Sequence, residues 1–124
     1  MPRFWLIAGA LSMLLALIIA ASFGHRPPEG FLPVTLSIFD TAREMHFVHA
    51  IALLAVGLTS AHFGRRRLFN YAGVAFLVGT LCFCGGIYLG YGPLPAIRPI
   101  IPIGGIAFMT GWLLFALGAY RLGS

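Results

Sequence analysis

The chain has 124 residues, of which 60% are hydrophobic and only 9% are charged, whereas globular proteins carry about 25% charged residues. Its net charge of +5 comes from eight arginines, with no lysine, against Glu29, Asp40 and Glu44. The arginines stand at the ends of apolar runs rather than on one basic face, which argues against nucleic acid as a partner and suits anionic lipid headgroups.

Three stretches of the chain contain no charged side chain: residues 4–24, 68–97 and 99–120. A helix rises about 1.5 Å per residue, so about 20 apolar residues cross a hydrocarbon layer about 30 Å thick. A soluble domain of this length has no interior large enough to enclose three such segments. The sequence therefore predicts a single integral membrane domain, residues 1–124, surrounded by the lipid bilayer.

The first predicted transmembrane helix covers about residues 4–23. Arg3 before an apolar run and the small residues at positions 20–22 would also suit a signal peptide. The apolar run is longer than the roughly 7 to 15 residues of a signal-peptide core, so the sequence favours a retained helix. Prolines and glycines in residues 24–30 end this helix.

Residues 31–39 are apolar but too few to span a bilayer, and they include Pro33. We expect this segment to lie along the membrane interface. Asp40 and Thr41 have side chains typical of a helix N-cap. The second predicted helix accordingly covers about residues 41–63.

Gly64 and the three arginines after it form a short turn, which makes the second and third helices antiparallel neighbours. The third predicted helix covers about residues 68–88. Residues 90–102 are rich in proline and are predicted to form a rigid loop. The fourth helix, residues 102–120, begins at Pro102, a residue suited to the first helical turn.

Four spans place both chain ends on one side of the membrane, together with the arginine turn. That side carries Arg3, Arg65, Arg66, Arg67 and Arg121, and the other carries Arg26, Arg43 and Arg98. Because cytoplasmic loops hold an excess of basic residues, the N- and C-termini and the turn are predicted to be cytoplasmic. Tyr88 and Tyr120 fall at predicted helix ends, as interfacial aromatics do, whereas Trp112 lies near mid-helix.

Small residues recur on one face of two predicted helices. The first helix carries Ala8, Ser12, Ala16, Ala20 and Gly24, and the fourth carries Gly104, Gly111 and Gly118. Lipid provides no hydrophobic drive for helix association, so close backbone approach and van der Waals contact must provide it. These positions are predicted to be helix-packing surfaces, facing either the rest of the bundle or another protein.

Charged and titratable side chains gather near the outer end of the second helix. They are Asp40, Arg43, Glu44, His46 and His49, with His25 on the same side of the membrane. His49 lies about two turns into the predicted helix, where polar groups usually face the bundle interior and find partners. The first interpretation of this cluster is structural hydrogen bonding and capping.

Three functional interpretations of the cluster stay open. Two histidines three residues apart with a nearby carboxylate could bind zinc or copper. Histidines from facing helices could ligate haem. A membrane histidine beside acidic groups could also relay protons. No cofactor is predicted, and the identity of any metal is left unknown.

Four sequence blocks, in order, resemble the small four-helix membrane proteins grouped as domain of unknown function 423. The blocks are residues 21–25 (Ala-Ser-Phe-Gly-His), 39–53, 83–88 (Phe-Cys-Gly-Gly-Ile-Tyr) and 102–105 (Pro-Ile-Gly-Gly) followed by Gly111-Trp112. Cys84 and Gly86 stand where that family usually has serines, and His46 where it more often has an aromatic or polar residue. The resemblance implies a four-helix inner-membrane protein and no established activity.

The sequence therefore predicts an all-α, four-helix transmembrane bundle, which crosses the bacterial inner membrane several times. The favoured function is a packing, assembly or accessory protein that associates with itself or with another membrane protein. One alternative is an oligomeric channel or transporter with His46 and His49 at its outer mouth, and another is a haem- or metal-binding membrane protein. No nucleophile–base pair or phosphate loop stands out, which leaves the outer cluster as the place for any catalysis and favours a non-enzymatic role.

Overall fold

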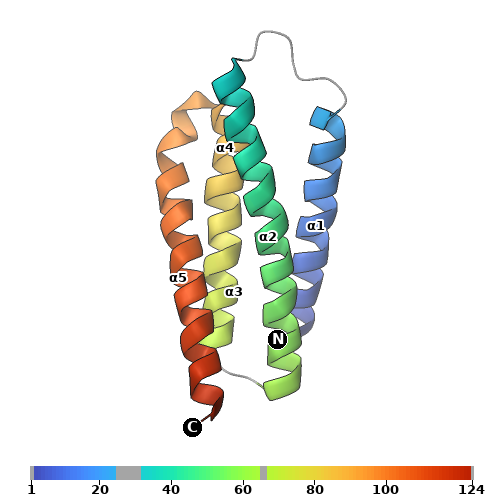
Figure 1. The fold of residues 1–124 in the computed structure, drawn as a ribbon, viewed down its shortest axis with the longest axis vertical. Coiled ribbons are helices and arrows are strands. Elements are labelled where there is room, and N and C mark those ends of the chain that lie inside the picture. Colours follow the sequence, from blue (N-terminus) through green and yellow to red (C-terminus); the bar gives the residue numbers. More distant parts are fainter. Residues whose placement is uncertain (1, 25–31, 65–66, 124) are drawn as a thin grey trace.

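The chain folds as four long antiparallel helical rods (Figure 1). A computed structural model describes residues 2–24, 32–64 and 67–123. The first rod is α1 (Pro2–Gly24), and the second is α2 (Pro33–Phe63). The third rod consists of α3 (Arg67–Gly79), the π-helical turn η1 (Thr80–Cys84) and α4 (Gly85–Gly90). The fourth rod consists of the 3-10 helix η2 (Pro95–Ile100), α5 (Ile101–Tyr120) and the 3-10 turn η3 (Arg121–Gly123). All four rods are long and apolar enough to cross a membrane. The predicted all-α, four-helix transmembrane bundle is confirmed.

The prediction for the start of the second helix was wrong. α2 begins at Pro33 after Leu32, so Asp40 and Thr41 lie inside the helix rather than at its N-cap. Of the predicted interfacial segment, residues 33–39 are the first two turns of α2 and Leu32 is the N-cap, whereas Phe31 lies outside the described residues. Pro33 occupies the first helical turn, where its missing N–H removes no hydrogen bond. The N–H groups of Thr35 and Leu36 donate to the Leu32 carbonyl at 2.9 and 3.1 Å.

The predicted rigid loop is also more regular than expected. Residues 91–93 form a turn, and the proline-rich stretch after it is η2, which leads directly into α5. Proline fixes φ near −65°, a value that 3-10 helices tolerate. Arg98 fastens this connection to the end of α4: its Nε donates to the Gly90 carbonyl at 2.8 Å, and its guanidinium lies 4.2 Å from the Tyr91 ring centre.

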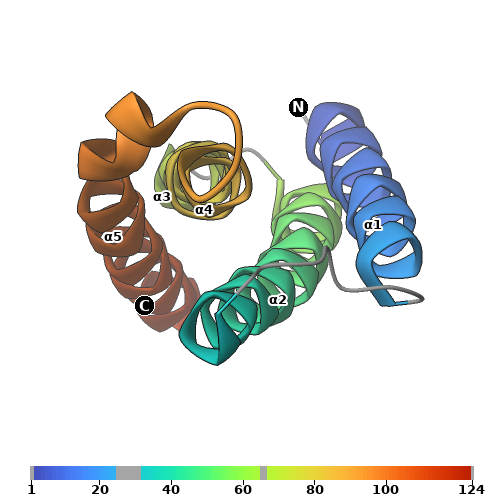
Figure 2. The same cartoon turned by 90° about the horizontal axis from the view of Figure 1, so that it is seen from above.

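The rods associate as two pairs. The most extensive contacts join α1 to α2 and α3 to α5, and α2 also contacts α3. Viewed from one end, α1 and α5 lie at opposite flanks of the bundle, with α2 and the third rod between them (Figure 2). The molecule therefore has an N-terminal helix pair and a C-terminal helix pair, with α2 and the third rod at the junction.

Within the C-terminal pair, a small residue on one helix faces a large residue on the other along the whole contact. In antiparallel order, Phe69 lies against Gly118, Phe76 against Gly111, Gly79 against Phe108, Phe83 against Gly104 and Gly86 against Ile101. A Cβ built on Gly111 would lie 2.6 Å from the ring of Phe76, which no real side chain tolerates. Each large side chain thus fills the space that a missing side chain leaves, and this gives the van der Waals contact that holds helices together in lipid.

The N-terminal pair uses the same device. A Cβ built on Gly9 of α1 would lie 2.9 Å from Leu54 of α2, and one built on Gly57 of α2 would lie 2.7 Å from Leu6 of α1. The glycine of each helix receives a leucine of the other. The backbones of α1 and α2 can therefore approach closely without a cavity between them.

We predict that Gly104→Ala destabilises the bundle and that Gly105→Ala does not. A methyl group at Gly104 would lie 2.7 Å from the Cβ and 2.8 Å from the Cα of Phe83, so the backbone of the third rod would have to move. At Gly105 the nearest atom is 3.9 Å away. Overpacking costs about 1–3 kcal/mol, measurable as a change in the free energy of unfolding in mild detergent with added denaturing surfactant. Equal effects of the two substitutions would contradict this account of the α3–α5 contact.

The orientation of the bundle gives a second prediction. The starts of α1 and α3, the end of α2 and the C-terminal turn η3 lie at one end of the molecule (Figure 1), and Arg67, the first residue of α3, is exposed; Arg65 and Arg66 lie outside the described residues. The basic excess predicts this end to be cytoplasmic. A membrane-impermeant maleimide added to intact cells should label Leu32→Cys at the opposite end and leave Gly123→Cys unlabelled until the cells are opened. The reverse pattern would invert the topology.

Candidate functional site

The structure divides the predicted polar cluster into an exposed part and a buried part. Arg43 pairs with Asp40 one turn away on α2, and both side chains are accessible. Glu44 is also exposed, whereas His46 and His49 are 2% and 3% exposed. His25 lies outside the described residues. The acidic groups and the histidines therefore do not form one site in this region of the chain.

His46 connects three helices. Its Nδ1 lies 3.1 Å from the hydroxyl oxygen of Tyr88 in α4, and its Nε2 lies 3.1 Å from the Oγ of Ser12 in α1. Both distances are within hydrogen-bond range. The imidazole thus forms a bridge from the N-terminal pair to the C-terminal pair, with a hydroxyl group on each side of the ring.

His49 connects α2 to α5. Its Nδ1 lies 2.7 Å from the Met45 carbonyl oxygen, and Trp112 Nε1 donates to its Nε2 at 3.0 Å. A carbonyl only accepts and an indole N–H only donates, so the partners assign His49 as the neutral tautomer with the proton on Nδ1. A proton or a metal ion on Nε2 would first have to displace Trp112.

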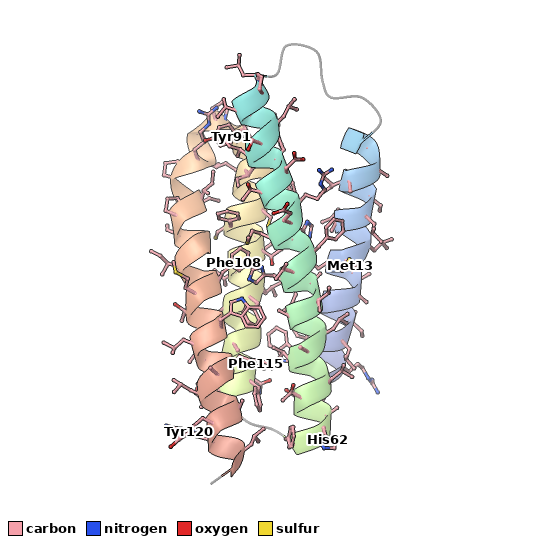
Figure 3. All side chains as sticks on the ribbon, viewed as in Figure 1. Met13, His62, Tyr91, Phe108, Phe115 and Tyr120 are labelled. Carbon is pink, nitrogen blue, oxygen red and sulfur yellow. The ribbon has the colours of Figure 1, made fainter. Side chains whose placement is uncertain are left out.

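Aromatic rings enclose His49 on the remaining sides. Phe108 stacks on the imidazole with ring centres 3.6 Å apart and planes 14° apart, and Phe76 lies tilted at 5.6 Å. Trp112 also packs against Phe76, with centres 4.8 Å apart. Figure 3 shows Phe108 and Phe115 directed from α5 into the bundle and Tyr120 directed away from it. His49 is a packed interior side chain as well as a hydrogen-bonded one.

Two more polar contacts join the helix pairs. Trp5 Nε1 of α1 donates to Asn70 Oδ1 of α3 at 2.9 Å, and the Cys84 thiol of η1 donates to the Ala42 carbonyl of α2 at 3.3 Å. Together with the histidine bridges, they connect the two pairs at several depths. Small-to-large packing runs along each pair and also occurs between the pairs, where a Cβ built on Gly73 would lie 2.7 Å from the Trp5 ring. These side-chain hydrogen bonds add to that packing at the junction.

The buried polar groups do not assemble a metal centre in the described ranges. There, no three His, Cys, Asp or Glu side chains lie close enough together to hold an ion. His46 faces α1 and α4, whereas His49 faces α5, so the two histidines do not present their nitrogens to a common point. The pair spacing that motivated a metal or haem interpretation therefore corresponds to two separate bridges.

The predicted packing residues of the first helix face the bundle to different extents. Ala16 is buried, and Ala8, Ser12 and Ala20 are half-buried; Gly24 is the last residue of α1. The closest approach to α2 is made by Gly9, beside the predicted stripe. Ala8 and Ser12 instead line a cavity between α1, α2 and the third rod.

That cavity lies directly beside His46. Its volume is about 290 Å³, and its wall combines apolar side chains with Ser12, His46, Thr80, Cys84 and Tyr88. Thr80 and Cys84 belong to η1, where the helix widens for one turn. The Thr80 hydroxyl donates to the Phe76 carbonyl at 2.8 Å, the way Ser and Thr side chains supplement an irregular backbone ladder in membrane helices.

Sequence reasoning missed the partners of the histidines. Tyr88 fits an interfacial aromatic by its position, but it faces His46, and its ring stacks against Phe39. The sequence did contain one signal for the partner of His49, which is the depth of Trp112 in the membrane. Trp112 stands near mid-helix, far from the interface that tryptophan prefers, and a membrane-embedded indole N–H needs an acceptor such as His49.

We predict a measurable coupling between His49 and Trp112. His49→Ala and Trp112→Phe should each lower the free energy of unfolding in mild detergent, and the double variant should lose less than the sum. Hydrogen bonds between membrane helices are worth about 0.5–2 kcal/mol, so the coupling energy should fall in that range. Tyr120→Phe, which alters an 82% exposed side chain, should combine additively with His49→Ala. A coupling of zero for the His49–Trp112 pair would contradict the bridge.

Comparison with known proteins gives relatives along nearly the whole chain. An inner membrane protein of Escherichia coli K12, UPF0382 inner membrane protein YgdD, is 32% identical over 97% of this chain and 92% of its own length. UPF0382 membrane protein SSP2132 of Staphylococcus saprophyticus is 29% identical over 97% and 99%, and UPF0382 membrane protein YwdK of Bacillus subtilis is 28% identical over 96% and 98%. No solved structure matches the chain.

The family described as protein of unknown function (DUF423) matches residues 19–105. This range includes α2, the whole third rod, η2 and the start of α5. The expectation from the four sequence blocks is confirmed. The chain belongs to the DUF423 family and is a multi-pass protein of the bacterial inner membrane.

Proposed function

We propose that this protein is a non-catalytic accessory protein of the inner membrane, which acts by associating with itself or with another membrane protein. The observation that carries this proposal is the state of the two buried histidines. Each has both ring nitrogens within hydrogen-bond distance of groups of the same bundle. Both residues therefore serve to hold a rigid bundle together.

A catalytic or transport role would require these histidines to exchange protons or hydrogen-bond partners. A general acid or base must have a nitrogen free to exchange a proton with substrate, and an ion pathway needs polar groups whose partners change during the cycle. The neutral tautomer of His49 is held from both sides, by Met45 and by Trp112. Either function would first require the α2–α5 bridge to open.

The outer helices support association as the mode of action. α1 and α5 lie at the two flanks of the bundle (Figure 2), and they are less buried than α2 and the third rod. A compact bundle of 13.3 kDa with His46 and His49 directed inward presents two mainly apolar helices to its surroundings. Lipid, a second copy and a different membrane protein are the neighbours that such surfaces meet.

The proposal predicts that the protein, expressed at its natural level and extracted in a mild detergent, migrates in a complex larger than one chain. Cross-linking in intact membranes before extraction should trap the same complex, since association takes place in the bilayer. An unrelated four-span protein of similar size, extracted in parallel, should remain free of that complex. A single chain surrounded only by lipid, in both extraction and cross-linking, would contradict the accessory role.

Separate measurements test the channel or transporter function and the haem- or metal-binding function. If reconstituted protein conducted protons or ions, and His49→Ala abolished that flux without lowering thermal stability, His49 would be functional rather than structural. We further propose that the bundle works without haem or metal. A Soret band in the absorbance spectrum, or zinc, copper or iron in stoichiometric amount by elemental analysis of the purified protein, would overturn that part.

A further inference from the structure

The cavity beside His46 has the features of a ligand site rather than of a packing defect. It is about 290 Å³ in volume, near the lower end of the roughly 300–1,000 Å³ of small-molecule pockets. Its wall is mainly apolar, with Leu11, Leu15 and Leu77 among its side chains, and it carries a few polar groups that converge from three helices. No charged side chain lines it, so an uncharged ligand is the one that fits.

A count of hydrogens shows that the cavity offers a donor. Ser12, neutral His46 and Tyr88 together have three polar hydrogens, and the chain Ser12···His46···Tyr88 uses two of them. Whichever way the imidazole is protonated, one hydroxyl donates to its free nitrogen and the other accepts from its N–H. The accepting hydroxyl keeps its own hydrogen, for which the described residues provide no other partner.

Among the described residues, the other polar groups of the wall make no hydrogen bond to Ser12 or Tyr88. The Thr80 hydroxyl donates to the Phe76 carbonyl, and the Cys84 thiol donates to the Ala42 carbonyl. An O–H group without an acceptor in an apolar environment is unfavourable by about 1–3 kcal/mol. The site is therefore complementary to a molecule that brings a hydrogen-bond acceptor.

The depth of the cavity restricts the source of that acceptor. Ser12 is the central residue of the span Pro2–Ser22, which places its hydroxyl about 15 Å from either edge of the hydrocarbon layer. The ester carbonyls of phospholipids lie at those edges. A lipophilic molecule that moves freely through the hydrocarbon layer can present a carbonyl at mid-depth.

The backbone beside the cavity keeps the space open. η1 forms part of the wall, and single π-helical turns occur frequently at functional sites. Gly85 follows it, and a Cβ built on Gly85 would meet nothing within 4 Å. Most interior glycines of this bundle receive a large side chain from the facing helix, whereas the space in front of Gly85 is unfilled.

We propose that this cavity binds the ring of an uncharged, lipid-soluble carbonyl compound of the quinone class, with the free hydroxyl of Ser12 or Tyr88 donating to a ring carbonyl. The apolar wall packs against the ring, and the apolar tail of the ligand leaves the cavity toward the lipid. The site does not depend on the accessory role, because a bundle that associates with no other protein would retain it.

The test uses a benzoquinone with a decyl tail, added to the full-length protein in phosphatidylcholine nanodiscs. Quenching of tryptophan fluorescence should saturate at one quinone per chain. Gly85→Leu fills the cavity and should weaken binding at least tenfold. Gly105→Leu, at a glycine that also has room but lies outside the cavity, should bind like the wild type. Quenching that rises linearly without saturation, or that is equal in all three proteins, would overturn the proposal.

Two further arms identify what the cavity recognises. Decylbenzene, which has the tail and ring without carbonyls, should fail to displace the quinone at equal concentration. The double variant Ser12→Ala/Tyr88→Phe should bind the quinone at least tenfold more weakly, whereas Thr59→Val, which removes a hydroxyl elsewhere on α2, should not. Binding in detergent that disappears in nanodiscs would assign the cavity to phospholipid, and equal binding of decylbenzene would reduce it to a non-specific apolar hollow. If the double variant does not fold, quinone binding by Gly85→Leu and competition by decylbenzene still test the proposal.

Discussion

The structure depends on one constraint: the hydrophobic effect does not drive helices together inside a lipid bilayer, so they associate only where their surfaces fit closely. The α3–α5 contact meets it by alternating glycine with phenylalanine across the two helices, from Phe69 and Gly118 at one end to Phe83 and Gly104 near the other. The α1–α2 contact meets it with Gly9 and Gly57. Because every large side chain fills the space of a specific missing one, a shift of one helix by a single turn would set rings against rings. Close packing therefore fixes the register of each pair as well as its stability.

Between the pairs, hydrogen bonds add to close packing. A polar group in the hydrocarbon region is unfavourable unless it has a partner, so matched polar groups on two helices select the arrangement in which they meet. His46, His49 and Trp5 each meet such a partner across the junction. Among the described residues, Ser60 is the exception, with a buried hydroxyl that has no partner. Shape complementarity thus makes the two helix pairs, and hydrogen bonding together with the fit of Trp5 against Gly73 determines how one pair sits on the other.

This division explains how far the sequence could be used. Charge-free runs and glycines repeated at seven-residue spacing are properties of one helix, so the spans and the glycine face of α5 could be predicted from them. The error at the start of α2 arose because Pro33 and Asp40 are both acceptable helix starts, and only the hydrogen bonds to Leu32 distinguish them. The partners of His46 and His49 could not be predicted, since spacing along a helix gives the face of a residue but not the register of the helix opposite. The family match and the helical spans identify the location and the fold, and they leave the activity open.

The bridge at His46 and the cavity beside it are consequences of the same arrangement. α1 makes its close contacts with α2, and it meets the third rod through Trp5, whose ring fills the space at Gly73 and whose Nε1 donates to Asn70. Toward η1, α1 lies across a cavity lined by Ser12, Thr80 and Cys84. The hydroxyl–imidazole–hydroxyl chain necessarily leaves one hydrogen unused in that space. A ligand that accepts this hydrogen adds a bond without breaking either bond of the bridge, so occupancy of the cavity would strengthen the junction between the helix pairs rather than compete with it.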